Sequence, residues 1–281
     1  MIKPRNMRKL GNAVICYAVL IFFSLLVLVP VAWMISTSFK TEPETIQIPP
    51  TWIPREPTIQ AYIRIWKDYP FVTYFKNSLI IVLGATLLST VVSCFAGYGV
   101  TRFNFRGKGS FMTFMLMTQM FPSIMLLIPY YKVLSIYGLM NTHLGMILVY
   151  VSFTIPFCSW MMAGFFKSIP VELDEAAIID GCSRMRAFRS IILPLTLPGI
   201  ASTAMYSFIT GWNEYMFAQV LISDPTLKTV PIGIAELNGF YKILWNDMMA
   251  ASLIASIPLI LLFLVSQRSF ISSLTAGAVK Q

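Results

Sequence analysis

Charged side chains are scarce in this sequence. Asp, Glu, Lys and Arg make up 12% of its 281 residues, against about 25% in ordinary soluble domains. Hydrophobic residues make up 57%. This composition excludes an ordinary soluble domain and predicts an integral membrane protein of the all-α, multi-pass class.

Histidine and cysteine are also rare. His143 is the single histidine, which excludes a histidine-based metal cluster and a Ser/His/Asp catalytic arrangement. Three of the four cysteines, Cys16, Cys94 and Cys158, lie in apolar stretches, and Cys182 lies in a charged one. None has the paired, extracellular setting of a disulfide framework. We therefore expect no metal site, catalytic site or cofactor in this chain.

The phosphate-binding motif GxxxxGK[ST] is absent as well. The nearest match, Arg106-Gly107-Lys108-Gly109-Ser110, lacks the first glycine at the required spacing and reads as a basic loop. If ATP drives this protein, another chain binds the nucleotide.

The formal net charge of +9 does not indicate a nucleic-acid partner. Basic residues stand at the ends of apolar segments, which is the signature of membrane topology, because cytoplasmic loops are rich in Lys and Arg. On this rule both termini lie in the cytoplasm.

Apolar segments follow one another along the chain and predict about six membrane-spanning helices. The first, residues 11–36, is longer than the apolar core of a signal peptide and is expected to be retained, as a helix that can lie outside the main bundle. The others are Asn77–Val100, Phe111–Pro129, Leu144–Phe165, Gly199–Leu221 and Met248–Ser266. We expect one transmembrane domain over residues 1–281, with a core bundle at 77–266 and a cytoplasmic tail at 267–281.

Residues 166–198, between the fourth and fifth segments, form the one densely charged stretch. Ser168 and Pro170 suit the start of a helix, three acids follow in its first turn, and Gly181 suits its end. Ser183 can cap a second helix. A solvated amphipathic loop is the ordinary alternative for such a cluster.

The order of residues in this stretch favours a more specific interpretation. Glu175-Ala176-Ala177, then Asp180-Gly181, Phe188 and Leu193-Pro194-Leu195 resemble the EAA loop of binding-protein-dependent ABC importer permeases. Two further motifs agree: Asn213-Glu214 between Trp212 and Tyr215, and the ending from Leu274 to Lys280. The resemblance covers nearly the whole chain and is strongest for the MalG-like subunits of carbohydrate importers. Cys182 stands where such permeases usually have alanine.

The resemblance implies a role for the charged stretch. The helix from Val171 to Asp180 would be the coupling helix that sits in a cleft of an ATPase subunit, with Glu175 facing a basic residue there. The residues assigned to this contact are Glu172, Asp174, Glu175, Ala176, Ala177, Asp180 and Gly181. The tail residues Thr275, Ala276 and Gly277 would reach the interface of the ATPase pair; a frayed terminus is the alternative.

The resemblance also implies the partners. They are a second homologous permease subunit, two ATPase subunits that hold ATP and Mg, an extracytoplasmic substrate-binding protein, membrane lipid and a carbohydrate, most simply an oligosaccharide. The chain would form half of the translocation pathway in the bacterial cytoplasmic (inner) membrane. A neutral oligosaccharide, an acidic oligosaccharide and a polyol phosphate all remain open as substrates.

The sequence evidence for residues that line the translocation pathway is weaker than that for the charged stretch. Glu214 is the only acid within an apolar segment, and it either faces a cavity or sits at the outer interface. Asn213, Gln119, Tyr206 and Ser207 are the other candidates. An ion- or proton-coupled secondary transporter is the alternative function, but it would show inverted repeats and several buried ionisable residues. An intramembrane enzyme would need a catalytic constellation, which the sequence does not offer.

Overall fold

The computed structural model describes residues 4–239 and 242–278, with side chains for residues 13–239 and 242–267. Regular structure in these residues is helical, apart from one isolated bridge between Asn238 and Ile243. The chain divides into two compact units. The first contains residues 1–70 and 234–255, and the second contains residues 71–233 and 256–281. This confirms the predicted all-α class.

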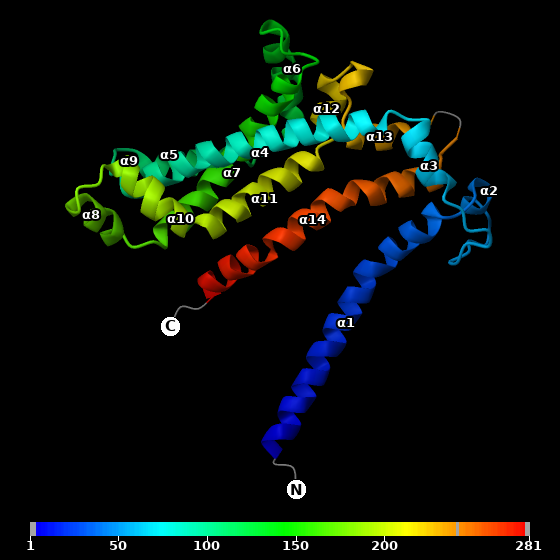
Figure 1. Ribbon diagram of the computed structural model, residues 1–281, viewed down its shortest axis with the longest axis horizontal. Coiled ribbons are helices and arrows are strands. Elements are labelled where there is room, and N and C mark those ends of the chain that lie inside the picture. The colour runs from blue at the N-terminus through cyan, green and yellow to red at the C-terminus, as the bar shows by residue number, and fades with distance from the viewer. Residues whose placement is uncertain (1–3, 240–241, 279–281) are drawn as a thin grey trace. The chain divides into compact units, whose positions relative to one another are not determined.

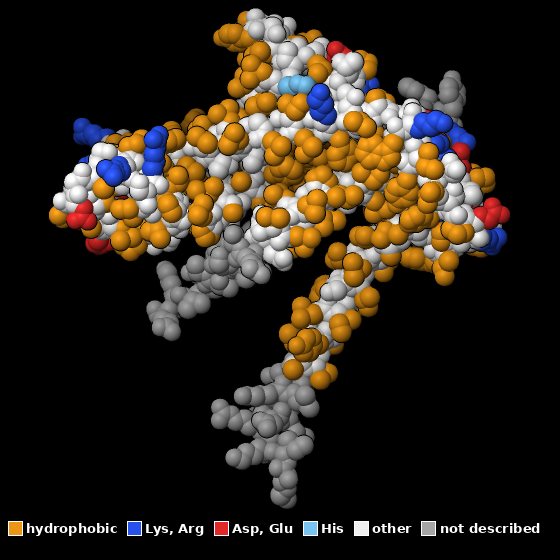
Figure 2. All heavy atoms as spheres, in the orientation of Figure 1, with side chains coloured by type: hydrophobic (Ala, Val, Ile, Leu, Met, Phe, Trp, Pro, Cys, Tyr) orange, Lys and Arg blue, Asp and Glu red, His pale blue; other side chains and the backbone are white. Residues whose placement is uncertain are grey.

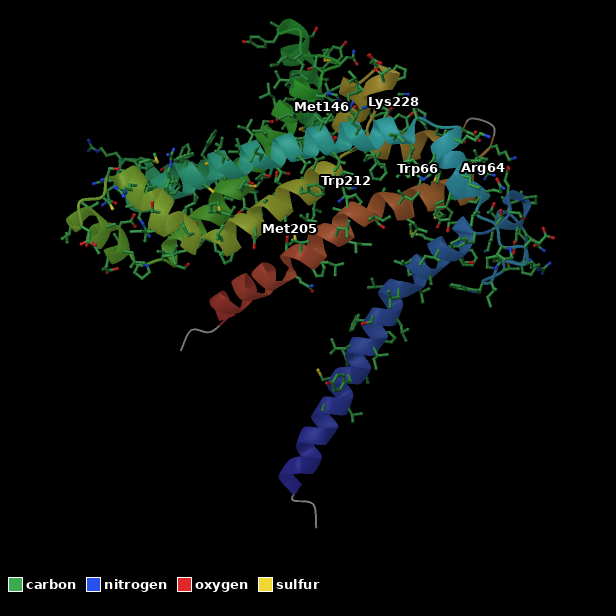
Figure 3. The ribbon with its side chains drawn as sticks, viewed as in Figure 1. Arg64, Trp66, Met146, Met205, Trp212 and Lys228 are labelled. Carbon is green, nitrogen blue, oxygen red and sulfur yellow. The ribbon has the colours of Figure 1, made fainter. Side chains whose placement is uncertain are left out.

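Three helices of the second unit pack side by side (Figure 1). They are α4 (Phe71–Arg102), α7 (His143–Lys167) and α11 (Leu197–Trp212). Their hydrophobic core includes Met146 from α7 and Trp212 from α11 (Figure 3). The ring of Trp212 stacks on Phe208 with centroids 5.6 Å apart. Figure 2 shows hydrophobic side chains along the flank of this bundle, as expected where lipid is the solvent.

Small and hydroxyl residues let α4 and α7 approach closely. A Cβ atom on Gly97 would lie 2.8 Å from the backbone nitrogen of Ala163. Ser89 and Thr154 share a buried hydrogen bond of 2.7 Å between their hydroxyls. Packing through small residues and interhelical hydroxyl contacts is typical of helices in membranes.

The second expected segment, Asn77–Val100, is longer than predicted, since α4 begins at Phe71 directly after Pro70. The aromatic rings of Phe71 and Tyr74 are buried, so this extra turn packs against protein.

The third expected segment, Phe111–Pro129, is two helices and not one. Helix α5 (Lys108–Thr118) and the helices η1 (Ser123–Leu126) and α6 (Leu127–Ile136) meet at a bend of 94°. Pro122 lies at the break, where its missing N–H cannot continue the hydrogen-bond ladder of α5.

The fifth expected segment, Gly199–Leu221, is interrupted too. Helix α11 ends at Trp212, and the short helix α12 (Met216–Leu221) follows. Before α11, the chain runs through α10 (Leu193–Leu195) at a bend of 76°. Two further short helices follow α12: η3 (Pro225–Leu227) and α13 (Val230–Glu236).

The charged stretch forms a helix, a turn and a second helix at one end of the bundle (Figure 1). Helix α8 (Glu172–Ile179) ends before Gly181, whose φ of 84° is in the left-handed region that favours glycine. Ser183 caps α9 (Arg184–Ala187) as predicted, and a π-helical segment, η2 (Phe188–Ile192), continues it. Ser168 differs from its prediction: it follows α7, and its hydroxyl donates to the Phe165 carbonyl oxygen at 2.7 Å.

The first unit contains α1 (Pro4–Ser38), α2 (Glu42–Thr45), α3 (Gln60–Lys67) and the first turns of α14 (Trp245–Ala278). Arg64 of α3, labelled in Figure 3, forms an ion pair with the buried Asp247 of α14. This pair and the hydrogen bond from Asn246 to the Lys40 carbonyl oxygen tie α14 to the segment after α1.

Among the described residues, four helices are long and apolar enough to cross a membrane. The number rises to six if each bent pair forms one span, in agreement with the predicted count. These helices include Ala13–Ser38 of α1, and α14 continues through most of the predicted tail, as far as Ala278. The predicted single domain and the cytoplasmic position of the termini remain predictions.

Candidate coupling surface and translocation-path residues

Helix α8 presents one exposed face. Glu172, Glu175, Ala176 and Ile179 are all exposed, and their spacing of three and four residues places them on the same side of a helix. Ile179 is 84% exposed, an unusual state for an isoleucine. Among the residues that the structure describes, Glu175 has no ion-pair partner. In particular, it pairs with neither Arg184 nor Lys167. This face therefore combines free negative charge with an apolar contact.

The opposite face of α8 is fixed to the end of α4. Asp174 is buried, and the Arg102 side chain donates through Nε to its Oδ2 at 2.7 Å. The Tyr98 hydroxyl donates to Asp174 Oδ1 at 2.8 Å. Arg102 Nη2 also donates to the Ile169 carbonyl oxygen at 2.9 Å, so one guanidinium holds both α8 and the segment before it. Ala177 is buried on the same side as Asp174.

Aromatic packing supports this attachment. Phe188 belongs to a hydrophobic cluster with Met162 and Phe166 of α7, and its ring lies 4.6 Å from that of Tyr98. The arginines of α9 and η2 stay exposed, and the guanidinium of Arg184 lies over the ring of Phe103 at 5.1 Å. Figure 2 shows basic and acidic side chains gathered at this end of the bundle.

The predicted pathway residues lie on two parts of the chain, at the end of α5 and along α11 and the break that follows it. Gln119 is exposed at the end of α5 and donates to the Phe153 carbonyl oxygen at 3.1 Å. Tyr206 is half-buried, with its ring 4.4 Å from that of Phe157. Ser207 is buried, and its hydroxyl has no hydrogen-bond partner among the described residues.

Glu214 lies in the break between α11 and α12, where its carboxylate holds the start of α12. It accepts from the backbone N–H groups of Phe217 at 2.7 Å and Ala218 at 3.1 Å. The hydroxyl of the buried Tyr150 donates to the same carboxylate at 2.9 Å. Asn213, its neighbour, is exposed and donates to the Ile209 carbonyl oxygen. The carboxylate thus joins α7, α11 and α12.

The predicted tail residues lie beyond residue 267, where the structure describes the backbone as far as residue 278 but no side chains. The backbones of Thr275, Ala276 and Gly277 belong to α14, but their side chains lie outside the described residues. Lys280 lies outside them entirely.

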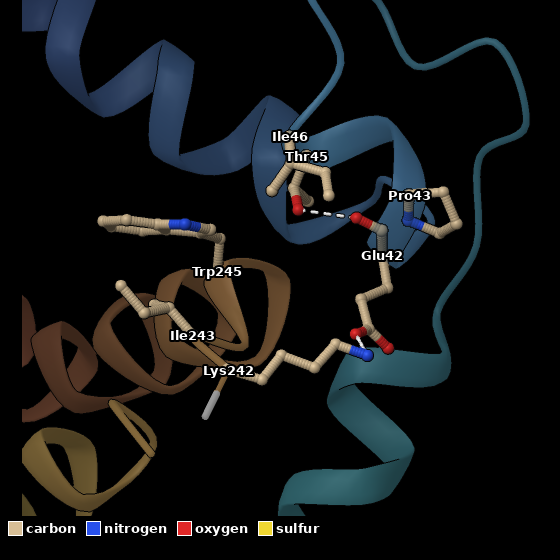
Figure 4. A pocket seen from close by; sticks show the side chains of 7 residues that line it. All are labelled: Glu42, Pro43, Thr45, Ile46, Lys242, Ile243 and Trp245. Atoms are coloured by element: carbon tan, nitrogen blue, oxygen red, sulfur yellow. Dashed lines mark hydrogen bonds and ion pairs between the residues drawn. The ribbon is translucent and has the colours of Figure 1, made fainter. Parts of the chain in front are cut away.

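The first unit contains a pocket that the sequence did not predict (Figure 4). Its cavity volume is about 440 Å³, and it is lined by Glu42, Pro43, Thr45, Ile46, Lys242, Ile243 and Trp245. An ion pair between Lys242 and Glu42 closes one side. None of the predicted pathway residues lines it.

Near this pocket, two buried charges have shifted pKa values. A hydrogen bond from the Arg55 backbone N–H to Glu44 lowers the pKa of that carboxyl. Burial lowers the pKa of Lys40, whose ammonium lies 4.1 Å from the ring centre of Trp33.

Sequence reasoning missed four residues with structural roles at the two ends of the bundle. They are Arg102, Tyr98, Tyr150 and Asn77, none of which the sequence analysis named as a site residue. Polar or ring-hydroxyl residues at the ends of spans are the signal that could have drawn attention to them.

The helical bundle and its bent spans define a polytopic membrane protein. The family described as "Binding-protein-dependent transport system inner membrane component" matches residues 89–275. The chain belongs to this family.

Relatives with assigned functions are similar over most of their length. The chain is 38% identical over 263 residues to the trehalose/maltose transport system permease protein MalG of Thermococcus litoralis, covering 92% of this chain and 94% of that protein. It is 35% identical over 263 residues to the diacetylchitobiose uptake system permease protein DasC of Streptomyces coelicolor, covering 94% and 95%.

A solved structure shares the fold. It is the crystal structure of a bacterial ABC transporter involved in the import of the acidic polysaccharide alginate. The TM-score is 0.79 at 22% identity, and the match covers 96% of this chain and 99% of that chain.

These findings confirm the family resemblance drawn from the three motifs. The chain is an inner-membrane permease subunit of an ABC importer, and it is not an enzyme, since ATP hydrolysis in such importers belongs to separate subunits. They give no support to the ion- or proton-coupled alternative.

Proposed function

We propose that this permease imports a carbohydrate, most simply an oligosaccharide, and forms half of the pathway with a second, homologous permease subunit. Support comes from relatives whose names specify trehalose/maltose, diacetylchitobiose and galactooligosaccharide transport. An extracytoplasmic binding protein delivers the sugar, and two ATPase subunits, which hold ATP and Mg, drive the cycle.

The observation that carries the coupling role is the exposed face of α8. Glu175 and Glu172 offer unpaired carboxylates, Ala176 permits close approach, and Ile179 offers an apolar contact. A protein cleft with a basic residue would complement this face in charge and shape. Asp180 and Gly181 border the same face. Asp174 bonds to the end of α4 and Ala177 is buried, so the contact with the ATPase uses the other five predicted residues.

The pathway residues and the tail remain part of the proposal. Gln119, Asn213, Tyr206 and Ser207 are proposed to line the route, and Thr275–Gly277 to reach the ATPase pair. Glu214 serves the pathway by fixing α12.

The test of the coupling role is Glu175→Ala in the complex purified from membranes and reconstituted in vesicles. If Glu175 pairs with a cation in the ATPase cleft, sugar-stimulated ATP hydrolysis falls by about fivefold or more, the lower end of ordinary coupling between distinct sites. Glu175→Lys, which places a positive charge beside that cation, lowers sugar-stimulated ATP hydrolysis further than Glu175→Ala does. Glu172→Ala removes an acid from the same face one turn earlier and gives a smaller loss. Wild-type stimulation in Glu175→Ala would refute the contact.

The substrate class is tested in the same vesicles. Neutral and acidic oligosaccharides and a polyol phosphate are offered with the binding protein, and stimulation of ATP hydrolysis is measured. Uptake that persists when the proton gradient is collapsed but ATP is present separates this proposal from ion-coupled transport; stimulation by none of the sugars would contradict the carbohydrate assignment.

A further inference from the structure

Helix α4 differs from the other long helices of the chain. It runs for 32 residues without a proline, whereas α1, α7 and α14 contain Pro30, Pro156 and Pro258. At a rise of 1.5 Å per residue it is about 48 Å long, enough to cross a membrane with both ends outside the apolar layer. Both of its ends are held by polar side chains.

At its C-terminal end, α4 holds α8 through the contacts of Asp174 with Arg102 and Tyr98. Both charged side chains are nearly inaccessible to water, with 6% of the Arg102 side chain and 10% of the Asp174 side chain exposed. Hydrogen bonds to ionised groups with little water access are strong and directional. Helix α8 therefore cannot slide or rotate against the end of α4 without losing them.

At its N-terminal end, α4 holds the segment between α12 and α13. The buried Asn77 amide donates to the carbonyl oxygens of Thr226 at 2.9 Å and Lys228 at 3.0 Å, and Lys228 is labelled in Figure 3. The Ser78 hydroxyl accepts from the Val230 N–H at 2.9 Å. The Nε2 atom of His143, at the start of α7, lies 2.9 Å from the side-chain amide oxygen of Asn77.

Between these ends, α4 is a closely packed element. Gly97 brings it close to the backbone of α7. Because α4 contains no proline to kink it, a displacement of one end moves the helix as a unit rather than bending it. Apolar side chains alone could repack during such a movement, because dispersion contacts are not directional. Hydrogen bonds lengthened by more than a few tenths of an ångström weaken steeply.

We propose that α4 is the element that transmits displacement of α8 to the Thr226–Val230 segment at the opposite end of the bundle. In this proposal Asp174, Arg102 and Asn77 are positioning residues. The proposal rests on the proposed function, in which α8 is displaced by the ATPase. It adds the route by which that displacement reaches the other side.

The test compares variants of the two anchors in the reconstituted complex. Asp174→Asn removes the charge from the α8 anchor, and Asn77→Ala removes the amide from the opposite anchor. Arg106→Gln and Asn104→Ala are matched controls, since both residues are exposed in the connection after α4 and have no hydrogen-bond or ion-pair partner among the described residues. Each variant is assayed for ATP hydrolysis and for sugar transported per ATP hydrolysed.

A structural readout accompanies the assay. Spin labels at Ile178→Cys on a flank of α8 and Val91→Cys on α4 occupy sites that are 44% exposed in both cases. Cys16 and Cys182, which are not buried, are first replaced by serine. Double electron–electron resonance then gives the distribution of distances between α8 and α4 in each complex.

We expect both anchor variants to hydrolyse ATP but to transport at least about fivefold less sugar per ATP, the lower end of ordinary coupling strengths. Asp174→Asn broadens the distance distribution, whereas Asn77→Ala leaves it unchanged because the α8 anchor is intact. The double variant is no worse than the more severe single one, since both anchors lie on one route. If Asp174→Asn does not assemble, Tyr98→Phe, which removes one hydrogen bond, is expected to broaden the distribution less.

Two results would overturn the proposal. One is a wild-type distance distribution in both Asp174→Asn and Tyr98→Phe. The other is wild-type transport per ATP in Asn77→Ala. Wild-type coupling in Glu175→Ala, by contrast, contradicts the ATPase contact and leaves the two anchor results to be judged separately.

Discussion

Replacing Glu214 with alanine should destabilise the bundle, because this carboxylate holds the break between α11 and α12. It accepts three hydrogen bonds, from Phe217, Ala218 and Tyr150. The first two satisfy backbone N–H groups that the start of α12 leaves without intrahelical acceptors. The third satisfies a hydroxyl on a side chain that is 1% exposed.

The magnitude follows from these contacts. Hydrogen bonds to charged groups contribute about 1.5–3 kcal/mol each, and a buried hydroxyl left without an acceptor costs about 1–3 kcal/mol. Water can reach part of the site, so values at the low end apply to the backbone bonds. Two backbone bonds at about 1.5 kcal/mol each and the orphaned hydroxyl at about 1 kcal/mol mean that Glu214→Ala should lower the free energy of unfolding by about 4 kcal/mol. Tyr150→Phe removes a single bond and should cost about 1.5 kcal/mol.

The assay is denaturant unfolding of the purified protein in detergent, with transport by the reconstituted complex measured in parallel. Glu214→Gln retains one acceptor oxygen and should fall between wild type and alanine. Asn213→Ala, at the exposed neighbouring position, is the control and should change stability by less than about 0.5 kcal/mol. If Glu214→Ala is as stable as this control yet loses transport, the carboxylate faces the pathway and the reasoning from its hydrogen bonds is refuted.

Two further predictions concern packing and topology. Gly97→Ala should destabilise the protein by about 1–3 kcal/mol, because the new Cβ would lie 2.8 Å from the Ala163 backbone nitrogen. A Cβ atom on Gly99 would meet no other atom within 4 Å, so Gly99→Ala should instead stabilise the helix by about 0.5–1 kcal/mol. Equal effects of the two substitutions in unfolding experiments would contradict the close α4–α7 contact. Cysteines placed at Ser183 and Thr58, with Cys16 and Cys182 replaced, should react with impermeant reagents only from the cytoplasmic and the extracytoplasmic side respectively, and reaction of Ser183 from outside would reverse the proposed orientation.

The sequence predicted most of the helices because lipid imposes a simple requirement. Each span must satisfy its backbone within itself, so long apolar runs read directly as helices. Leu144–Phe165 was therefore found within two residues of α7 at either end. The breaks were harder to see. Pro122 and the Asn213-Glu214 pair interrupt apolar runs whose composition remains that of a span.

The charged stretch shows the other limit of sequence reasoning. Its helix, its glycine terminator and the Ser183 cap depend on neighbouring residues and were predicted. The orientation of the Asp174 side chain was not predicted, because its partners Arg102 and Tyr98 are 72 and 76 residues earlier in the sequence. Contacts of this length depend on how α4 and α7 pack, and single-sequence patterns contain no signal for them.

Two of the three acids at the start of α8 are exposed and one is buried, and this difference decides how the coupling test must be interpreted. Glu172, Asp174 and Glu175 all lie in the first turn, where negative charge interacts favourably with the helix dipole. Removing any of them therefore weakens the helix, whether or not it contacts a partner. Because Glu172 and Glu175 are both exposed and share this effect, it largely cancels when their alanine variants are compared. A larger loss of stimulated ATP hydrolysis in Glu175→Ala must then come from a contact outside this chain, whereas equal losses would indicate only a weakened helix.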